Sequence, residues 1–206
     1  MTPYQTEQLQ TLQMVRRYLA QIFDAEREAL KESLADYLTF REAVDAFQEN
    51  YFRDICNRKC YQSKLSACCS RDGIIIFFAD VIINALMAEP AALKRLQDVL
   101  TYPHQGFKCV FLGHEGCLWR IKPIVCEMFL CDAAQNAVLK ENPVARRRWD
   151  ALVRQKKDYT WPDRPVLFDT LEQICIEAGY TSSLMYLHNS PGLLRVKQQG
   201  TQSKAK

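Results

Sequence analysis

Apolar side chains recur every three or four positions along much of the chain, which is the spacing of an amphipathic helix. The first two series, between residues 4 and 38, are Leu9, Leu12, Val15, Leu19 and Ile22, then Leu30, Leu34 and Leu38. Thr39 and Glu42 have the spacing of a capping box, which satisfies free amides at a helix start. These patterns predict a helical N-terminal arm over residues 1–53, with a new helix starting near Thr39.

The middle of the chain mixes strand-like and helical patterns. "GIIIFF" at 73–78 is β-branched and aromatic, which predicts a short buried strand. Residues 79–100 show helical periodicity, and we expect Pro90 to break that helix or to lie in the first turn of a second one. "FKCVFL" at 107–112 and "GCLWRI" at 116–121 predict two more strands, joined as a hairpin by "GHE".

Helical patterns return after Cys131, near residues 132–140, 143–157 and 169–178, with proline-containing breaks between them. The final "KQQGTQSKAK" contains no large apolar side chain and is expected to fray. We therefore predict a single domain over residues 1–206 that is mainly α. Its helices surround a small cysteine-rich, partly β or irregular metal-binding centre at 54–132, with C-terminal helices at 133–190 and a flexible tail at 191–206.

Length and composition indicate where in the cell, and with which partners, this chain is expected to be found. With 206 residues and 48% hydrophobic content, it can bury a core without disulfides. Its first residues lack the pattern of a signal peptide, and its longest apolar stretch is interrupted by Asp80 and Asn84. We therefore expect a reducing, cytoplasmic location. The net charge of +3 is small, so neither a membrane nor a nucleic acid is an expected partner, and a protein partner stays open.

Eight of the nine cysteines fall in two groups, and this density indicates metal binding. The groups are Cys56, Cys60, Cys68 and Cys69, then Cys109, Cys117, Cys126 and Cys131. Thiolates suit zinc or an iron–sulfur cluster. The alternative is that a cysteine is a small buried hydrophobe, which we weigh for Cys109 and Cys131 and favour for Cys175 on its amphipathic helix.

The spacing of the cysteines leaves both metals open. No CxxC motif occurs, so an ordinary zinc ribbon or finger is not indicated, and the runs typical of ferredoxins are absent. The adjacent Cys68 and Cys69 and the wide intervals between the other cysteines favour a cluster enclosed by loops over zinc.

The order of these features resembles the YkgJ-type cysteine cluster family, whose domains chelate zinc or iron. The similar parts are CxxxC…CC, then "DGIIIFFADVIINAL", then CVFL…GCLW…KPIVCEMFLC, together covering about residues 56–131. The resemblance implies that all eight cysteines of the two groups are metal ligands, for an iron–sulfur cluster or Zn²⁺. The family's first block is usually a compact CxxCxxCC, and Lys122 and Glu127 stand here in place of arginines.

Some members of this family are similar to flagellin lysine N-methylases. The resemblance therefore implies, as one alternative, an iron–sulfur enzyme that acts in redox chemistry or in protein lysine N-methylation. A purely structural zinc protein is the other alternative. The chain has no glycine-rich nucleotide loop, so the residues outside the cysteine region do not themselves indicate methyl transfer.

A few other polar residues are candidates for chemistry. His104 and His114 flank the second cysteine group and could replace a thiolate, although ordinary loop histidines fit as well. Acidic residues beside the cysteines could act as bases or oxygen ligands: Asp72, Asp80, Glu127 and Asp132. For Asp80 and Asp132 we favour charges at helix starts. The basic stretch at 145–157 could bind phosphate, but we favour a solvated helix face with Trp149 and Leu152 packed inward.

Overall fold

The fold, obtained as a computed structural model, is mainly helical, as the sequence predicts. The structure describes residues 1–63, 65, 68–70, 75–104, 106–160, 163–190, 192–193 and 195–197. The elements in chain order are α1 (Pro3–Gln21), α2 (Asp24–Ser33), α3 (Ala35–Phe52), the π-helix η1 (Arg53–Tyr61), α4 (Phe78–Met87), α5 (Pro90–Thr101), β1 (Leu112–Gly113), β2 (Gly116–Cys117), α6 (Ile124–Glu127), α7 (Asp132–Ala134), the π-helix η3 (Gln135–Leu139), α8 (Pro143–Thr160), α9 (Leu167–Glu177) and α10 (Tyr186–Asn189).

The N-terminal arm is divided into three helices. α1 begins at a capping box, in which Thr2 Oγ1 accepts from the Gln5 N–H at 3.2 Å and the Gln5 side chain accepts from the Thr2 N–H at 3.1 Å. The predicted helix start at Thr39 is wrong. Thr39 lies inside α3, and its hydroxyl donates to the Ala35 carbonyl at 3.1 Å. The buried Tyr37 and Phe40 lie on either side of it in sequence, and packing along this continuous apolar face keeps the helix intact.

The middle of the chain is more helical than predicted. Residues 73 and 74 of the expected strand lie outside the described residues, and 75–77 form no strand; α4 begins at Phe78. The cause is Asp80, which accepts from the Phe77 N–H at 3.0 Å and so caps a helix start where the apolar composition suggested a strand. Pro90 is the first residue of α5, in agreement with the prediction.

The predicted hairpin is present, although its strands are short. β1 pairs antiparallel with β2, Leu112 opposite Cys117 and Gly113 opposite Gly116. Gly116 has a φ of +121°, a conformation that other residues rarely adopt. The tight turn between the two strands therefore depends on glycine.

The C-terminal helices agree with the expected ranges, and α10 was not predicted. The expected tail at 191–206 needs one correction, because Lys197 is buried and its ammonium lies 2.6 Å and 2.7 Å from the two carboxylate oxygens of Asp169. Residues 198–206 lie outside the described residues. Lys197 itself is therefore held against α9.

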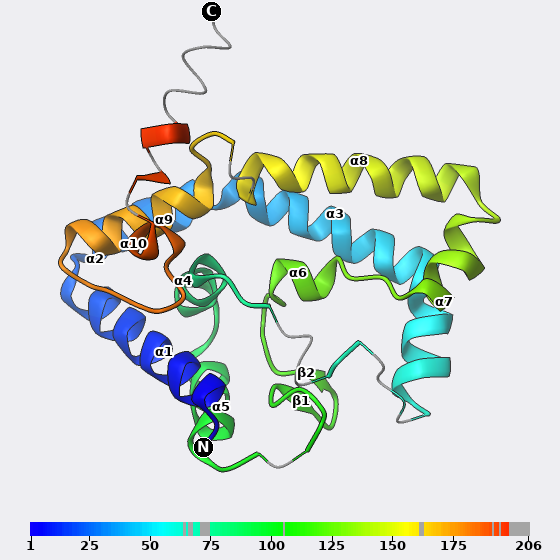
Figure 1. The fold of residues 1–206 in the computed structure, drawn as a ribbon, viewed down its shortest axis with the longest axis horizontal. Helices are drawn as coiled ribbons and strands as arrows, with labels where there is room; N and C mark the ends of the chain where they lie inside the picture. Colours follow the sequence, from blue (N-terminus) through cyan, green and yellow to red (C-terminus); the bar gives the residue numbers. More distant parts are fainter. Residues whose placement is uncertain are drawn as a thin grey trace, which may run out of the picture.

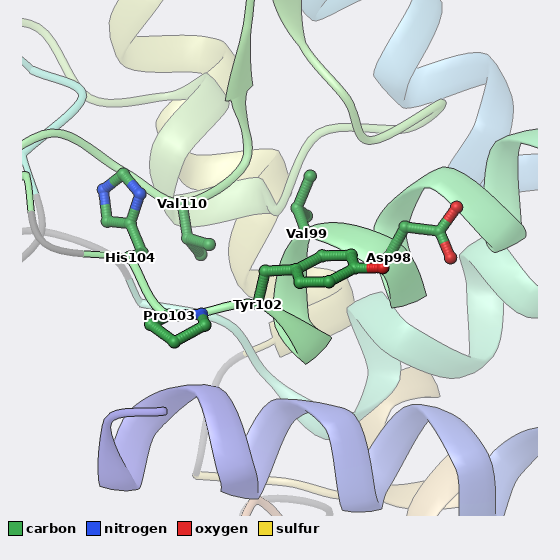
Figure 2. Close-up of a pocket in the computed structure, with 6 residues that line it drawn as sticks. All are labelled: Asp98, Val99, Tyr102, Pro103, His104 and Val110. Atoms are coloured by element: carbon green, nitrogen blue, oxygen red, sulfur yellow. The ribbon is translucent and has the colours of Figure 1, made fainter.

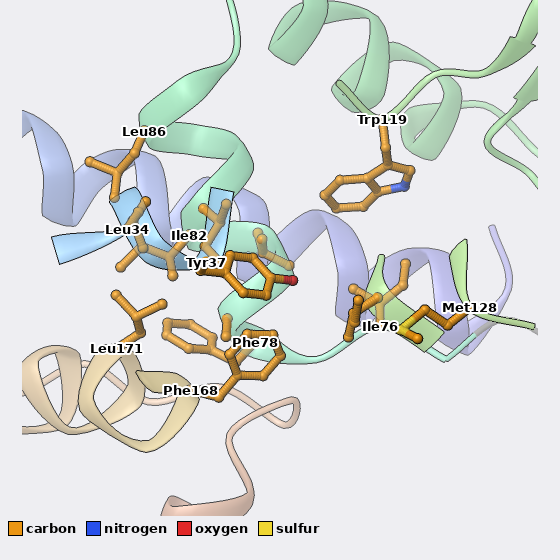
Figure 3. Packing of buried hydrophobic residues seen from close by; sticks show 14 of the residues in the cluster. Leu34, Tyr37, Ile76, Phe78, Ile82, Leu86, Trp119, Met128, Phe168 and Leu171 are labelled. Carbon is orange, nitrogen blue, oxygen red and sulfur yellow. The ribbon is translucent and has the colours of Figure 1, made fainter. Parts of the chain in front are cut away.

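The hydrophobic core lies between helices that are distant in sequence (Figure 1). α1 packs on α4 and α5, α3 on α8, and α4 on α9. Figure 3 shows Tyr37 of α3, Phe78 of α4 and Phe168 of α9 packed together, with the rings of Tyr37 and Phe168 5.6 Å apart. Cys56, Cys109 and Cys131 of the cysteine region pack against this core.

The basic stretch forms the middle of α8. Trp149 is buried and stacks on Phe47 at 5.4 Å, Leu152 packs against the core, and Arg147 and Arg148 are exposed. This is the solvated helix face that we favoured. In the part of the chain that the structure describes, no helix has both the length and the apolar character needed to cross a membrane.

Candidate metal centre

A backbone bridge brings the end of the first cysteine group to the start of the second. The Cys109 N–H donates to the Cys69 carbonyl at 2.9 Å, and Ser70 pairs with Lys108 in an antiparallel β-bridge. The chain between them forms α4 and α5 (Figure 1). Cysteines that are far apart in sequence are therefore neighbours in space.

The π-helix η1 carries the first two cysteines. It continues α3 directly, and its wider turns are visible in the bond from the Gln62 N–H to the Asn57 carbonyl at 2.8 Å, five residues back. Cys56 and Cys60 are four residues apart, so this winding keeps them on one side of the helix. The hydroxyl of Tyr61, at the end of η1, donates to the Gly113 carbonyl at 3.2 Å and so ties this helix to the hairpin.

Four thiols from three segments form what we name the first thiol set: Cys56, Cys60, Cys68 and Cys131. Burial raises the pKa of Cys56 to about 11, and the charges of the other three thiols act in the same direction. Cys131 directly precedes α7, so this set joins η1, the vicinal pair and the chain after α6.

The remaining four thiols form the second thiol set: Cys69, Cys109, Cys117 and Cys126. The Cys68 thiol donates to Cys69 and lowers the pKa of Cys69, whereas the charges of Cys109, Cys117 and Cys126 raise it. Burial raises the pKa of Cys109 to about 12, and Cys117 and Cys126 add to this effect. The charge of Cys68 also raises the pKa of Cys126, so the two sets adjoin.

Exposure separates these eight cysteines from the ninth. Cys68 and Cys117 are exposed and the other six are half-buried, whereas Cys175 is buried inside α9, as predicted. Among the described residues the nine cysteines are thiols and not disulfides, and no three His, Cys, Asp or Glu side chains form a group that could hold a metal ion. The thiols of each set are electrostatic neighbours, and they do not converge on one point.

Two buried polar side chains of α4 hold the segment before Cys126. Asn84 donates to the Ile121 carbonyl at 2.7 Å and accepts from the Ile121 N–H at 3.0 Å. Asp80 accepts from the Ile124 N–H at 3.1 Å, and burial raises its pKa to about 6. Asp80 therefore acts at a helix start, as we favoured, and also fixes the cysteine segment. Asn84 was noted only as a polar interruption of the apolar stretch, and its attachment to Ile121 was not predicted.

α3 holds the same segment from another side. The buried Arg41 donates to the Lys122 carbonyl at 2.7 Å, and Gln48 donates to the Glu127 carbonyl at 2.9 Å. Lys122 and Glu127 form an ion pair at 2.8 Å, so the side chains on either side of Cys126 contact each other. Arg41 and Gln48 were also missed, because neither lies near a cysteine in the sequence.

The two histidine candidates lie on either side of Cys109 in the chain. His104 Nε2 forms a hydrogen bond with the Lys108 carbonyl at 2.8 Å and lines a pocket of about 290 Å³ (Figure 2). His114 is exposed in the hairpin turn, Asp132 is exposed in the first turn of α7, and Asp72 lies outside the described residues.

In comparisons with known proteins, no family model matches this chain, and neither a curated protein nor a solved structure matches it.

Proposed function

We propose that the protein binds metal through thiolates arranged in the two sets, Cys56, Cys60, Cys68 and Cys131, and Cys69, Cys109, Cys117 and Cys126. The observation that carries the proposal is the bridge that joins the two cysteine groups, in which the Cys109 N–H donates to the Cys69 carbonyl at 2.9 Å. Cys68 is among the electrostatic neighbours of Cys56, whereas those of Cys69 include Cys109, Cys117 and Cys126. Each set supplies the four sulfurs of a tetrahedral thiolate site.

The contrast with Cys175 supports a chemical role over simple packing. A cysteine that serves as a small hydrophobe is expected to be buried, and Cys175 is 0% exposed. None of the eight cysteines in the sets is fully buried, although Cys56, Cys109 and Cys131 pack against the core. Packing alone therefore explains the burial of Cys175, but it does not explain why the other eight cysteines stay partly exposed.

The chemistry of the donors fits the proposed metal. Four thiolates repel one another, and a cation compensates that repulsion. We propose that metal draws the four thiols of each set together, and that the backbone held by Asp80, Asn84 and Arg41 supports one side of the centre. Zinc would stabilise the fold there, and an iron–sulfur cluster would supply one-electron chemistry. Thiolate ligands suit both.

The first experiment identifies the metal. The full chain is purified without oxygen and analysed for metal, acid-labile sulfide and visible absorption. Iron with sulfide and a brown colour supports a cluster, and a colourless protein with two zinc ions supports structural zinc sites. A chain that retains no metal after incubation with Zn²⁺, or with Fe²⁺ and sulfide, would contradict the proposal.

The second experiment tests the two sets. Cys56→Ser and Cys68→Ser fall in one set, so the double variant should lose no more metal than either single variant. Cys68→Ser with Cys69→Ser should lose the metal of both sets. Cys175→Ala is the matched control and should keep full metal. Equal losses in the two double variants would show that the eight cysteines do not divide in this way.

A further inference from the structure

Two carboxyl groups of α9 are buried under the C-terminal part of the chain. Asp169 is 1% exposed and Glu172 is 0% exposed. They are three residues apart, so their side chains lie on the same side of the helix. α10 packs against α9 (Figure 1), and Lys197 contacts it from further along the chain. Acidic side chains are rarely buried without partners, so the partners of each carboxyl group are compared below.

Asp169 is fully paired. Its two carboxylate oxygens lie 2.6 Å and 2.7 Å from the ammonium nitrogen of Lys197. Oδ2 also accepts from the Val166 N–H at 2.9 Å, and Oδ1 accepts from the hydroxyl of Tyr186. The ammonium of Lys197 lies 5.1 Å from the centre of the Tyr186 ring. The positive charge of Lys197 is therefore balanced by Asp169.

Glu172 has no comparable partner. Its Oε2 accepts from the Leu187 N–H of α10 at 2.9 Å, and its Oε1 is shielded from solvent without a hydrogen-bond partner among the described residues. This cluster contains two carboxyl groups and one ammonium group. Its charges balance only when Glu172 carries a proton, because an ionised Glu172 would be a buried charge without a cation of its own.

The surroundings of Glu172 favour its protonated form. The titratable side chains around it are Asp169 and Cys175 of α9, Tyr186 and the exposed His188 of α10, and Lys197. Of the other helices that pack on α9, α4 contributes Asp80, which accepts from the Ile124 N–H, and α8 contributes Lys156, whose charged neighbour is Lys157. Burial raises the pKa of Glu172 to about 7, in agreement with the count of charges.

The chain before α10 is held by groups that do not titrate near neutral pH. The hydroxyls of Thr11 and Ser182 lie 2.6 Å apart, the Tyr180 hydroxyl donates to Gln21, and the Tyr180 N–H donates to the Cys175 carbonyl at 2.9 Å. Ionisation of Glu172 leaves these attachments unchanged. α10 is four residues long and follows them in the chain, so it can detach while α9 stays folded.

We infer that α10 and Lys197 form a strap that is closed over Glu172 while its carboxyl group is protonated and that opens when this group is ionised. Ionisation places a second negative charge beside Asp169, and opening lets water solvate it. The closed state binds the proton more tightly than the open state, so closure is favoured at low pH and weakens as the pH rises through about 7. The inference goes beyond the proposed function and is independent of metal binding.

The test measures amide hydrogen exchange of the full chain from about pH 5.5 to 8, corrected for the intrinsic effect of pH on exchange. The amides that report on the strap are those of Leu187, Asn189 and Ser190, which donate to Glu172, Met185 and Tyr186. Their protection should fall about tenfold between pH 5.5 and 7 and change little above pH 7, as expected for one carboxyl group. The Tyr180 amide should keep its protection.

Two variants assign the effect. Glu172→Gln keeps an oxygen for the Leu187 N–H and cannot ionise, so the fall in protection should disappear. Glu177→Gln removes an exposed carboxylate from the same helix and is the matched control, which should behave as the parent does. The inference fails if the parent shows no fall, if Glu172→Gln keeps it or if Glu177→Gln loses it. It also fails if the amides of α9 lose protection by the same factor, because the whole fold would then open.

Discussion

Asn84 provides a direct test of how the helical core holds the cysteine segment. It is 1% exposed and makes three hydrogen bonds, donating to the carbonyls of Asp80 at 3.0 Å and Ile121 at 2.7 Å and accepting from the Ile121 N–H at 3.0 Å. Asn84→Ala removes the whole amide. Both backbone polar groups of Ile121 then lose their partner, and the segment that leads to Cys126 loses one of its attachments to α4.

The expected cost follows from those two backbone groups. A typical hydrogen bond contributes about 1 kcal/mol net, and a buried polar group without a partner costs about 1 to 3 kcal/mol. Ile121 is half-buried, so water satisfies part of the loss. The better helix propensity of alanine offsets roughly 0.5 kcal/mol. The free energy of unfolding should therefore fall by about 2 to 3 kcal/mol, which lowers the melting temperature by about 5 to 10 °C in a chain of this size.

The assay combines urea unfolding with amide hydrogen exchange of the metal-free protein. The Ile121 amide should exchange faster in Asn84→Ala, with smaller changes in α8 and α9. Asn50→Ala is the control, because Asn50 is exposed near the end of α3. If Asn84→Ala lies within about 0.5 kcal/mol of Asn50→Ala, or if the Ile121 amide keeps its protection, the reasoning about this attachment is refuted.

Three further predictions concern α9. Cys175→Ala should lower the free energy of unfolding by about 1 kcal/mol through a small packing defect and leave metal content unchanged; a loss of metal would place Cys175 at the centre. Lys197→Met should destabilise by about 3 to 5 kcal/mol in urea, because Asp169 keeps a buried charge without its ion pair, and adding Asp169→Leu should recover most of that loss; no recovery would contradict the pairing. Burial raises the pKa of Glu172 from 4.5 to about 7, so the folded state binds that proton more tightly than the unfolded state. Protonated Glu172 should therefore add about 3 kcal/mol to the free energy of unfolding below pH 4.5, and this gain should disappear as the pH rises through about 7. Urea titrations from pH 4 to 8 should show this dependence on pH in the parent and not in Glu172→Gln. An unchanged dependence in Glu172→Gln would mean that another group causes it.

The helices that follow clear periodicity were predictable from the sequence. Pro90 marked the start of α5, because proline fixes the backbone angle φ, and "GHE" marked the hairpin turn, because glycine permits backbone angles that other residues avoid. The predicted helix start at Thr39 was wrong because the spacing of a capping box also occurs inside helices. The neighbouring Tyr37 and Phe40 decide the outcome there, and their burial depends on other helices.

The arrangement around the cysteines was less accessible from the sequence. η1 has no periodicity that separates a π-helix from an α-helix, so the winding around Cys56 and Cys60 could not be anticipated. The attachments of Arg41, Asp80 and Asn84 join residues that are distant in sequence. The distribution of Cys68 and Cys69 between two groups of neighbours likewise depends on where the chain after α5 returns.

The bridge between Cys69 and Cys109 has a consequence for the order in which the protein is made. α4 and α5 lie between these two residues, and every cysteine after Cys69 that belongs to either set is synthesised after both helices. During translation Cys56, Cys60, Cys68 and Cys69 leave the ribosome together, before any of their partners from the second half exist. Until Cys131 emerges, the nascent chain carries unassembled thiols, and in an oxidising environment such thiols can form incorrect disulfides during that interval.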